Sequence, residues 1–312
     1  MRFYFSGAFS PGPKAAHLED SLIRVCKHKL FSCHANYVKE AYAWMNKAVA
    51  MGVAKDYTVM LDSGAFTAWS IGKPMHMEEL LPIYKDIDAK FSKHFKELWY
   101  INLDVIPGTK ESPAGNEELD QALIDSDINF NILLQALGPK ILPVYHQGEP
   151  WDRLDVCCDM SSYICISPRQ TISEKYRVRW LHQVNQRVKS GVKMHGLATT
   201  GAETVKACDW FSVDSASWVM LGAMGKIATP YKNWMRPLQV SWESPKVKEL
   251  GAHIDNMTLA EVQMFNEFVE SYGYLMSDLR DSHGHRKAFN LLVLQDLIEK
   301  VIPPPHREQG LF

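Results

Sequence analysis

Short apolar runs alternate along the chain with longer stretches in which apolar residues return every three or four positions. A short run of β-prone residues indicates a strand, and the three-to-four spacing indicates one face of a helix. The β-prone runs are eight in number and lie at 2–6, 29–34, 57–62, 98–104, 141–146, 162–167, 192–197 and 210–214. The helical spacing occurs between them, at 36–51, 76–93, 116–136 and 173–189.

A strand followed by a helix, repeated along the chain, predicts parallel βα units. Eight units in roughly 215 residues fit a (β/α)8 barrel better than a six-stranded doubly wound sheet. We therefore expect an α/β protein with a TIM-barrel catalytic core at 1–221. A C-terminal extension at 222–312 is expected to pack on the barrel, with an irregular part at 222–256 and helices at 258–271 and 285–301.

The composition leaves a soluble globular protein as the simplest expectation. Of the 312 residues, 46% are apolar and 22% are charged, which is enough to bury a full core. The formal net charge is −2, so any binding to a polyanion has to come from local clusters of Lys and Arg. No apolar run is long enough for a membrane span or a signal peptide, so we expect a cytoplasmic protein with no membrane partner.

The six cysteines fall at irregular spacings without a CxxC pair. That pattern does not suggest a zinc or redox site, and free cysteine often behaves as a small apolar residue. We expect reduced, mostly buried thiols.

Polar residues cluster where six successive predicted strands end. In a barrel of this type the loops after the strands converge at one end, which is where the active site lies. A single Asp after a strand is usually a helix cap or a turn former. Asp62, Asp104 and Asp214 together are different, because three carboxylates at one rim repel each other unless a substrate or a proton compensates. We therefore predict a functional site there.

Five of these strand ends resemble, in order and with similar spacing, segments of the tRNA-guanine transglycosylase superfamily. The segments are LDSGAF at 61–66, LDVIPG at 103–108, YHQGE at 145–149, MHGLA at 194–198 and FSVDS at 211–215. They are similar to the family's DSGGFQ, Asp-Cys-Thr-Pro, VQGG, LMGVG and MFDC segments, and the resemblance covers the barrel from about residue 57 to 218.

The chain departs from that family in three places. Ala65 replaces a glycine, Thr67 replaces a glutamine, and SPRQ at 167–170 stands where a Gly-Gly-Leu segment is expected. The tRNA enzymes carry a three-cysteine, one-histidine zinc site after the barrel, yet this chain has no cysteine beyond Cys208, so we expect no metal and no cofactor. A short chain without that element looks like the phage branch that inserts 7-deazaguanine bases, such as preQ0, into DNA. If the chain is phage-encoded, that resemblance implies the host cytoplasm as its location.

The resemblance implies a base exchange at a glycosidic bond. Asp214 is implied as the nucleophile that attacks C1′ of the target guanosine, and Asp62 as the group that protonates the departing guanine. Asp104 is implied to accept hydrogen bonds from N1–H and the exocyclic amine of guanine. The further substrate-binding candidates are Gln147, Ser63, Gly64, Phe66, Ser167, His195 and Gly196, and Phe66 or Met194 is expected to cover the faces of the base.

A base paired in a duplex cannot reach such a rim, so the enzyme has to flip it out or act on an unpaired strand. Basic residues with interleaved aromatics follow strands six and eight, a pattern that suits phosphate contacts and base stacking. We predict contacts to nucleic acid, by resemblance DNA, from Arg169, Lys175, Lys226, Lys232 and Arg236.

Other interpretations remain open at this point. A tRNA-guanine transglycosylase would catalyse the same reaction on another polymer, and a barrel hydrolase acting on small nucleosides or sugars would use the same carboxylates. A noncatalytic nucleic-acid-binding subunit would not need Asp62 and Asp214 together. A homodimer is compatible with the sequence.

Overall fold

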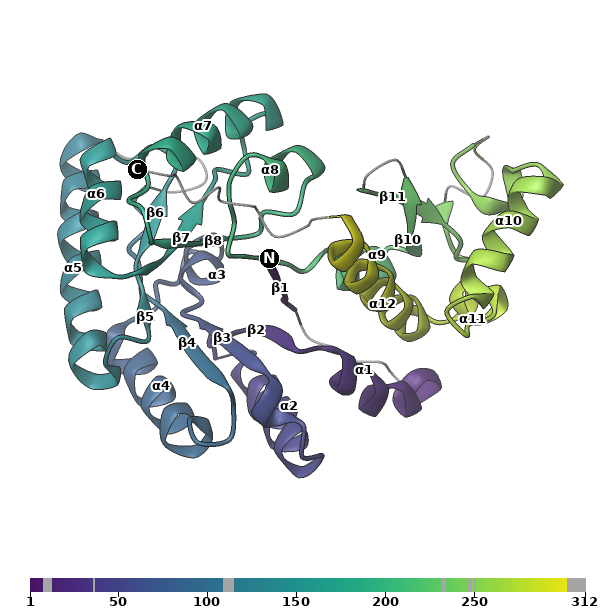
Figure 1. Ribbon diagram of the computed structural model, residues 1–312, viewed down its shortest axis with the longest axis horizontal. Helices are drawn as coiled ribbons and strands as arrows, with labels where there is room; N and C mark the ends of the chain where they lie inside the picture. The colour runs from purple at the N-terminus through teal and green to yellow at the C-terminus, as the bar shows by residue number, and fades with distance from the viewer. Residues whose placement is uncertain are drawn as a thin grey trace, which may run out of the picture.

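The computed structural model describes residues 1–7, 13–35, 37–108, 115–231, 234–245, 249 and 251–301. Its centre is one parallel sheet of nine strands, in the order β5-β4-β3-β2-β1-β9-β8-β7-β6 (Figure 1). The strands are β1 (Arg2–Phe5), β2 (His28–Ser32), β3 (Thr58–Asp62), β4 (Glu97–Ile101), β5 (Ile141–Leu142), β6 (Val144–His146), β7 (Tyr163–Ser167), β8 (Lys193–Gly196) and β9 (Ser212–Ser215).

The sheet closes on itself between β5 and β6, which stand at its two ends. These strands are consecutive in the chain and are separated only by Pro143, which has no N–H to donate to a ladder. β5 pairs with β4, β6 pairs with β7, and the amide of Cys165 donates to the carbonyl of Pro143 at 2.8 Å. β5 and β6 therefore act as one strand, and the predicted eight-stranded α/β barrel is confirmed.

Helices alternate with the strands around the outside of the barrel (Figure 1). The helices of the barrel part are α1 (Glu19–Val25), α2 (Val38–Ala50), α3 (Ala65–Ser70), α4 (Met77–Phe91), α5 (Asn116–Leu137), α6 (Trp151–Met160), α7 (Glu174–Arg187), α8 (Ala202–Lys206) and α9 (Ser217–Ala223), with 3-10 turns at Pro13–Leu18 and Ala54–Asp56. The four helices predicted here correspond to α2, α4, α5 and α7, so those predictions are confirmed.

The apolar side chains of the strands are divided between the two faces of the sheet. Side chains at alternate positions of a strand point to opposite faces, so the barrel interior and the sheet–helix layer receive different residues. Tyr4, Leu30 and Met60 belong to the cluster that fills the interior, whereas Phe5 and Phe31 pack toward the helices. This filled interior makes the barrel a rigid support for the rim above it.

The C-terminal extension contains more regular structure than the sequence suggests. Within the stretch expected to be irregular, β10 (Lys226–Tyr231) and β11 (Trp234–Gln239) form an antiparallel pair. Pro230 and Pro237 lie in these strands, which is compatible with a two-stranded sheet because each strand keeps one unpaired edge. A 3-10 turn (Ile254–Asn256) and helices α10 (Leu259–Glu270), α11 (Met276–Asp281) and α12 (His283–Val301) follow, and α10 and α12 confirm the two helices predicted there.

Helix α12 joins the extension to the barrel. Its buried residues Ala288, Leu291, Leu294 and Ile298 belong to a barrel core cluster that also contains Phe3 and Phe5. Its other face contributes Phe289, Val293 and Leu297 to the core of the extension. The two sets are spaced three or four residues apart, as expected of two faces of one helix. The division at residue 221 stays a prediction.

The six cysteines are all buried, and none forms a disulfide, which confirms the expectation for the thiols. In the part of the chain that the structure describes, no helix combines the length and the apolar character required to cross a bilayer.

Candidate active site

The three predicted carboxylates lie at the carboxyl end of the barrel. Asp62 is the last residue of β3, Asp214 lies in β9, and Asp104 follows β4. Parallel strands bring these ends to the same rim, and the charges of Asp104 and Asp214 both act on Asp62. The grouping that the strand ends predicted is therefore present in the structure.

Of the three rim carboxylates, Asp62 is the one with a strongly shifted pKa. Burial and the neighbouring charges of Asp104 and Asp214 raise its pKa from 3.8 to about 7. The backbone N–H of Gly64 donates to Oδ2 at 3.2 Å and acts in the opposite direction, but it does not outweigh the other effects. Asp62 can therefore hold or release a proton near neutral pH, as a general acid and base has to do.

Asp214 is held by the backbone of the loop after β8. Its side chain is 9% exposed, and its Oδ1 accepts a hydrogen bond from the N–H of Ala198 at 2.7 Å. The Nε2 atom of the buried His195 lies 3.5 Å from the same oxygen. Both contacts fall on Oδ1, and no contact of this kind is seen to Oδ2 in the described residues.

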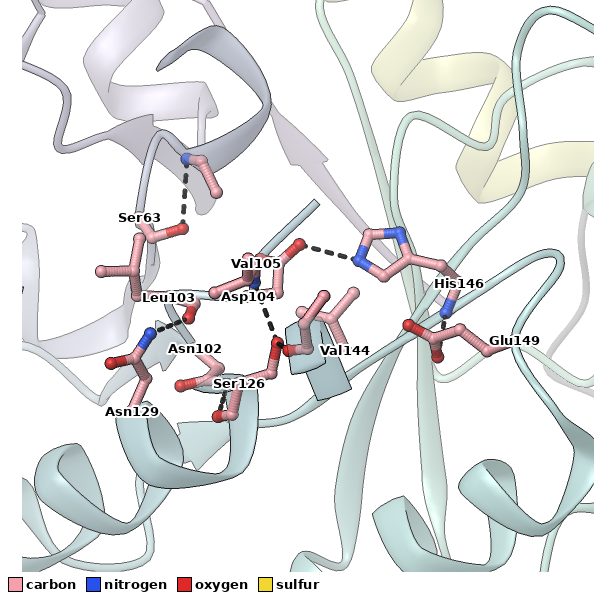
Figure 2. Close-up of polar contacts among 12 residues, drawn as sticks. Ser63, Asn102, Leu103, Asp104, Val105, Ser126, Asn129, Val144, His146 and Glu149 are labelled. Carbon is pink, nitrogen blue, oxygen red and sulfur yellow. Dashed lines mark hydrogen bonds and ion pairs between the residues drawn. The ribbon is translucent and has the colours of Figure 1, made fainter. Parts of the chain in front are cut away.

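Asp104 is hydrogen-bonded to a histidine that was not among the predicted site residues. Its Oδ2 lies 2.7 Å from Nε2 of His146, the last residue of β6 (Figure 2). Burial acts to lower the pKa of His146, but the hydrogen bond and the charge of Asp104 outweigh it, and the net pKa is raised. Glu149 lies behind His146 and accepts its backbone N–H at 3.0 Å.

Helix α5 fixes the loop that carries Asp104, as Figure 2 shows. The hydroxyl of Ser126 accepts the N–H of Val105 at 2.9 Å, and the side-chain amide of Asn129 donates to the carbonyl of Leu103 at 2.8 Å. Asn102, just before this loop, donates from its side chain to the carbonyl of Ser126 at 2.9 Å. These contacts come from both sides of Asp104 and hold it in place on a segment that is neither strand nor helix.

A cavity of about 580 Å³ opens beside Asp104, between α3 with the residues after it and the loop after β4. Its size is within the range of small-molecule sites, and most of its wall is apolar. The residues that line it are Ala65, Trp69, Ser70, Ile71, Gly72, Lys73, Pro74, Met75, Leu103, Asp104, Val105, Ile106 and Gly108. Trp69 donates from Nε1 to the carbonyl of Gly108 at 2.8 Å and so links the two walls.

Ser63, Gly64 and Phe66 form the turn from β3 into α3. The hydroxyl of the buried Ser63 accepts the N–H of Ala65 at 3.3 Å and supports the turn. Phe66 is 64% exposed, and its ring lies 5.8 Å from that of Trp69. Phe66 is therefore not a core residue and is free to cover a ligand, whereas Met194, the other residue considered for that role, is buried in the core.

Gln147 and Ser167 lie at the ends of neighbouring strands. The side-chain oxygen of Gln147 accepts the backbone N–H of Arg169 at 3.0 Å, which leaves its amide N–H groups as the available donors. Ser167 pairs with His146 in the register of β6 and β7. Gly148 lies under Arg169, since a Cβ there would approach the Arg169 guanidinium to 3.2 Å.

His195 and Gly196 lie below the rim rather than on it. The side chain of His195 is fully buried, and its Nδ1 is 2.6 Å from the hydroxyl of Ser212. A Cβ on Gly196 would approach Thr199 to 2.9 Å and Trp210 to 3.1 Å, so close packing accounts for this glycine. Neither residue presents a side chain to the open rim.

The predicted nucleic-acid-binding residues fall into two groups. Arg169 and Lys175 are exposed and lie before and within α7, and Lys226 and the exposed Arg236 belong to the β10–β11 pair. Figure 1 shows α7 and this pair well apart, so these four residues do not form one continuous patch. Lys232 lies outside the described residues.

Within the described ranges, no group of three or more His, Cys, Asp or Glu side chains is arranged to hold a metal ion. Comparison with known proteins adds no relative: no protein-family model matches the chain, and no curated protein matches it. The case for a function therefore depends on the geometry of the rim.

Proposed function

We propose that this chain is a DNA-guanine transglycosylase that exchanges guanine in DNA for a 7-deazaguanine base through a covalent glycosyl-aspartate intermediate. The observation that supports it best is the grouping of Asp62, Asp104 and Asp214 at one rim of the barrel, where burial and the two neighbouring carboxylates raise the pKa of Asp62 to about 7. A proton-transfer group beside a second, hydrogen-bonded carboxylate is the pair that a retaining exchange at a glycosidic bond requires.

In this proposal Asp214 supplies the nucleophile. Oδ1 is held by Ala198, so Oδ2 is the oxygen that attacks C1′ of the target nucleoside. The bond from C1′ to the guanine nitrogen breaks as the bond from C1′ to Oδ2 forms, and Asp62 gives its proton to the departing base. The incoming base then attacks C1′, its N–H proton passes to Asp62, and Asp214 leaves as a carboxylate.

Asp104 and Gln147 are the residues that recognise the base in this proposal. Oδ2 of Asp104 is occupied by His146, which leaves Oδ1 to accept from N1–H and the exocyclic amine of guanine. The amide N–H groups of Gln147 suit an acceptor such as O6, because its side-chain oxygen already accepts from Arg169. Adenine carries neither N1–H nor O6, so this arrangement selects against it.

The experiment that tests the proposal incubates the full chain with radiolabelled preQ0 and either DNA or tRNA and measures label in the polymer. We expect label in DNA, none after Asp214→Asn, and normal incorporation by the control Asp209→Asn, which replaces an exposed aspartate near the same strand. Label in tRNA alone would replace DNA by tRNA as the polymer. Label in neither, with the protein folded, would contradict the proposed reaction and favour a noncatalytic binding subunit.

A further inference from the structure

A chain of buried polar groups leads from the barrel interior to Asp214. Ser212 and Asp214 are two residues apart on β9, so both side chains face the interior, and His195 pairs with Ser212 in the register of β8 and β9. The hydroxyl of Tyr163 on β7 is 2.5 Å from that of Ser212, which is 2.6 Å from Nδ1 of His195. Tyr163, Ser212 and His195 are each at most 1% exposed.

The protons of this chain can be placed by counting donors and acceptors. Ser212 has one hydroxyl proton, so it can accept from Tyr163 and donate to Nδ1 of His195. The remaining ring nitrogen, Nε2, then carries the proton and faces Oδ1 of Asp214 at 3.5 Å. The opposite arrangement would set a lone pair of Nε2 against a carboxylate oxygen, with no other partner for this buried nitrogen.

The backbone on the other side of Asp214 is also specialised. Ala198, whose N–H donates to Oδ1, has a φ of +49°, and it is the one non-glycine residue with a positive φ in the described part of the chain. A left-handed alanine is strained, and such strain tends to lie where function requires a special backbone direction. Both this amide and His195 address Oδ1, which leaves Oδ2 for chemistry.

We infer that His195, set in its Nε2–H form by Ser212 and Tyr163, is the positioning residue of Asp214. This inference rests on the proposed function, in which Asp214 is the nucleophile. His195 keeps Oδ1 turned toward the barrel and Oδ2 toward C1′, and a movement of about half an ångström brings Nε2 within hydrogen-bond distance of Oδ1. When the C1′–Oδ2 bond later breaks, the same N–H stabilises the negative charge that the carboxylate regains on Oδ1.

The tautomer can be tested without any reaction. In protein labelled with ¹⁵N at the histidine ring nitrogens, the chemical shifts distinguish a protonated from an unprotonated nitrogen. We expect Nε2 of His195 to be protonated and Nδ1 to be an acceptor, and we expect Ser212→Ala to disturb the Nδ1 shift. A ring protonated at Nδ1 alone would overturn the inference whatever the chain catalyses.

The kinetic test compares two variants. His195→Leu removes the N–H donor, whereas the side-chain amide of His195→Gln supplies an N–H at a similar distance from the backbone. Loss of a residue that orients a metal ligand typically costs about 10–100-fold, and we expect a similar loss for a residue that orients a nucleophile. We expect His195→Leu to slow formation of the covalent adduct with labelled DNA by that factor, with KM for the free base changed by less than about threefold. His195→Gln should recover most of the rate, and the exposed His182→Leu should match the wild type.

The outcomes separate the positioning role from a merely structural one. Equal rates for His195→Leu and the wild type, or equally slow Leu and Gln variants with unchanged thermal unfolding, would overturn the inference. A wild-type protein that forms no adduct with either polymer would instead contradict the proposed function, and the ring-nitrogen shifts would then still decide the hydrogen-bond chain.

Discussion

Asp62 shows how two neighbouring carboxylates and burial change the chemistry of a third. A carboxyl with a pKa of about 7 is half protonated in the folded protein at neutral pH and largely protonated at lower pH, whereas in the unfolded chain it ionises near 3.8. The folded state therefore binds this proton more tightly. The stability that the proton contributes is complete below pH 4 and is lost as the pH rises through 7.

Asp62→Asn is accordingly expected to separate stability from activity. The amide cannot ionise, so the variant should resist urea better than the wild type at pH 8, by up to about 4 kcal/mol, and the difference should shrink at pH 4. Base exchange should fall by about 10²–10⁴-fold, because the proton donor is gone. Urea unfolding at both pH values and the incorporation assay measure the two effects.

Asp120→Asn, at an exposed position of α5, is the control for this comparison. A variant at position 62 that is less stable than the wild type at pH 8 would contradict the burial argument.

The sequence predicted the three carboxylates but not their partners, and the reason is the distance along the chain. Asp104 and His146 are 42 residues apart, and their contact depends on how β4 and β6 are placed around the barrel. His146 is the last residue of an apolar strand, so its position at the rim was visible in the sequence, but its pairing with Asp104 was not. His195 was predicted to bind substrate, which stays a prediction, and the structure places its buried ring 3.5 Å from Oδ1 of Asp214.

At the scale of elements, the turn from β3 into α3 sets the position of Asp62. Gly64 has a φ of +84°, a left-handed conformation that glycine adopts at little cost. Its N–H donates to Asp62, and a Cβ at this position would approach Cβ and the backbone N of His34 to 2.9 and 3.0 Å. The turn therefore requires glycine for its conformation and for the space.

Gly64→Ala should lower the free energy of unfolding by about 2–4 kcal/mol, since a left-handed conformation and a backbone clash act together. Gly72→Ala is a matched control, with a φ of +69° and no atom within 4 Å of the new Cβ, and it should cost only about 1–2 kcal/mol. Urea titration of both variants gives the comparison. Equal losses would show that the space beside His34 does not matter.

Helices and strands whose apolar residues repeat at a clear spacing were predicted well, and those without such a spacing were not. The strands are short apolar runs, and the four predicted barrel helices have an apolar face, so each was visible in the sequence. Helix α6, WDRLDVCCDM, is only ten residues long and buries Arg153 and two cysteines beside Leu154, so its apolar face was weak in the sequence and it was not among the predicted helices. The β10–β11 pair was hidden by Pro230 and Pro237, which usually exclude a strand and are tolerated here at unpaired edges.

At the scale of the whole molecule, α12 makes the barrel depend on the last part of the chain. Four of its side chains belong to the core that contains Phe3 and Phe5, and Asn290 accepts the N–H of Ala228 at 2.7 Å and donates to the carbonyls of Trp218 and Lys226. The helix thus fills the space beside β1 and holds the start of the extension. A barrel that ends at residue 221 lacks this cover.

A fragment of residues 1–221 is therefore expected not to fold stably. The fragment loses the burial that four apolar side chains of α12 provide and exposes the barrel residues that they cover, which costs about 6–10 kcal/mol and is comparable with the whole stability of a domain. Circular dichroism should show no cooperative thermal transition for the fragment. The cooperative transition should return when residues 283–301 are joined to residues 1–223 by a flexible linker, because α9 and α12 pack against each other. A cooperative transition in the fragment alone would instead make residues 1–221 an autonomous domain and α12 a dispensable cover.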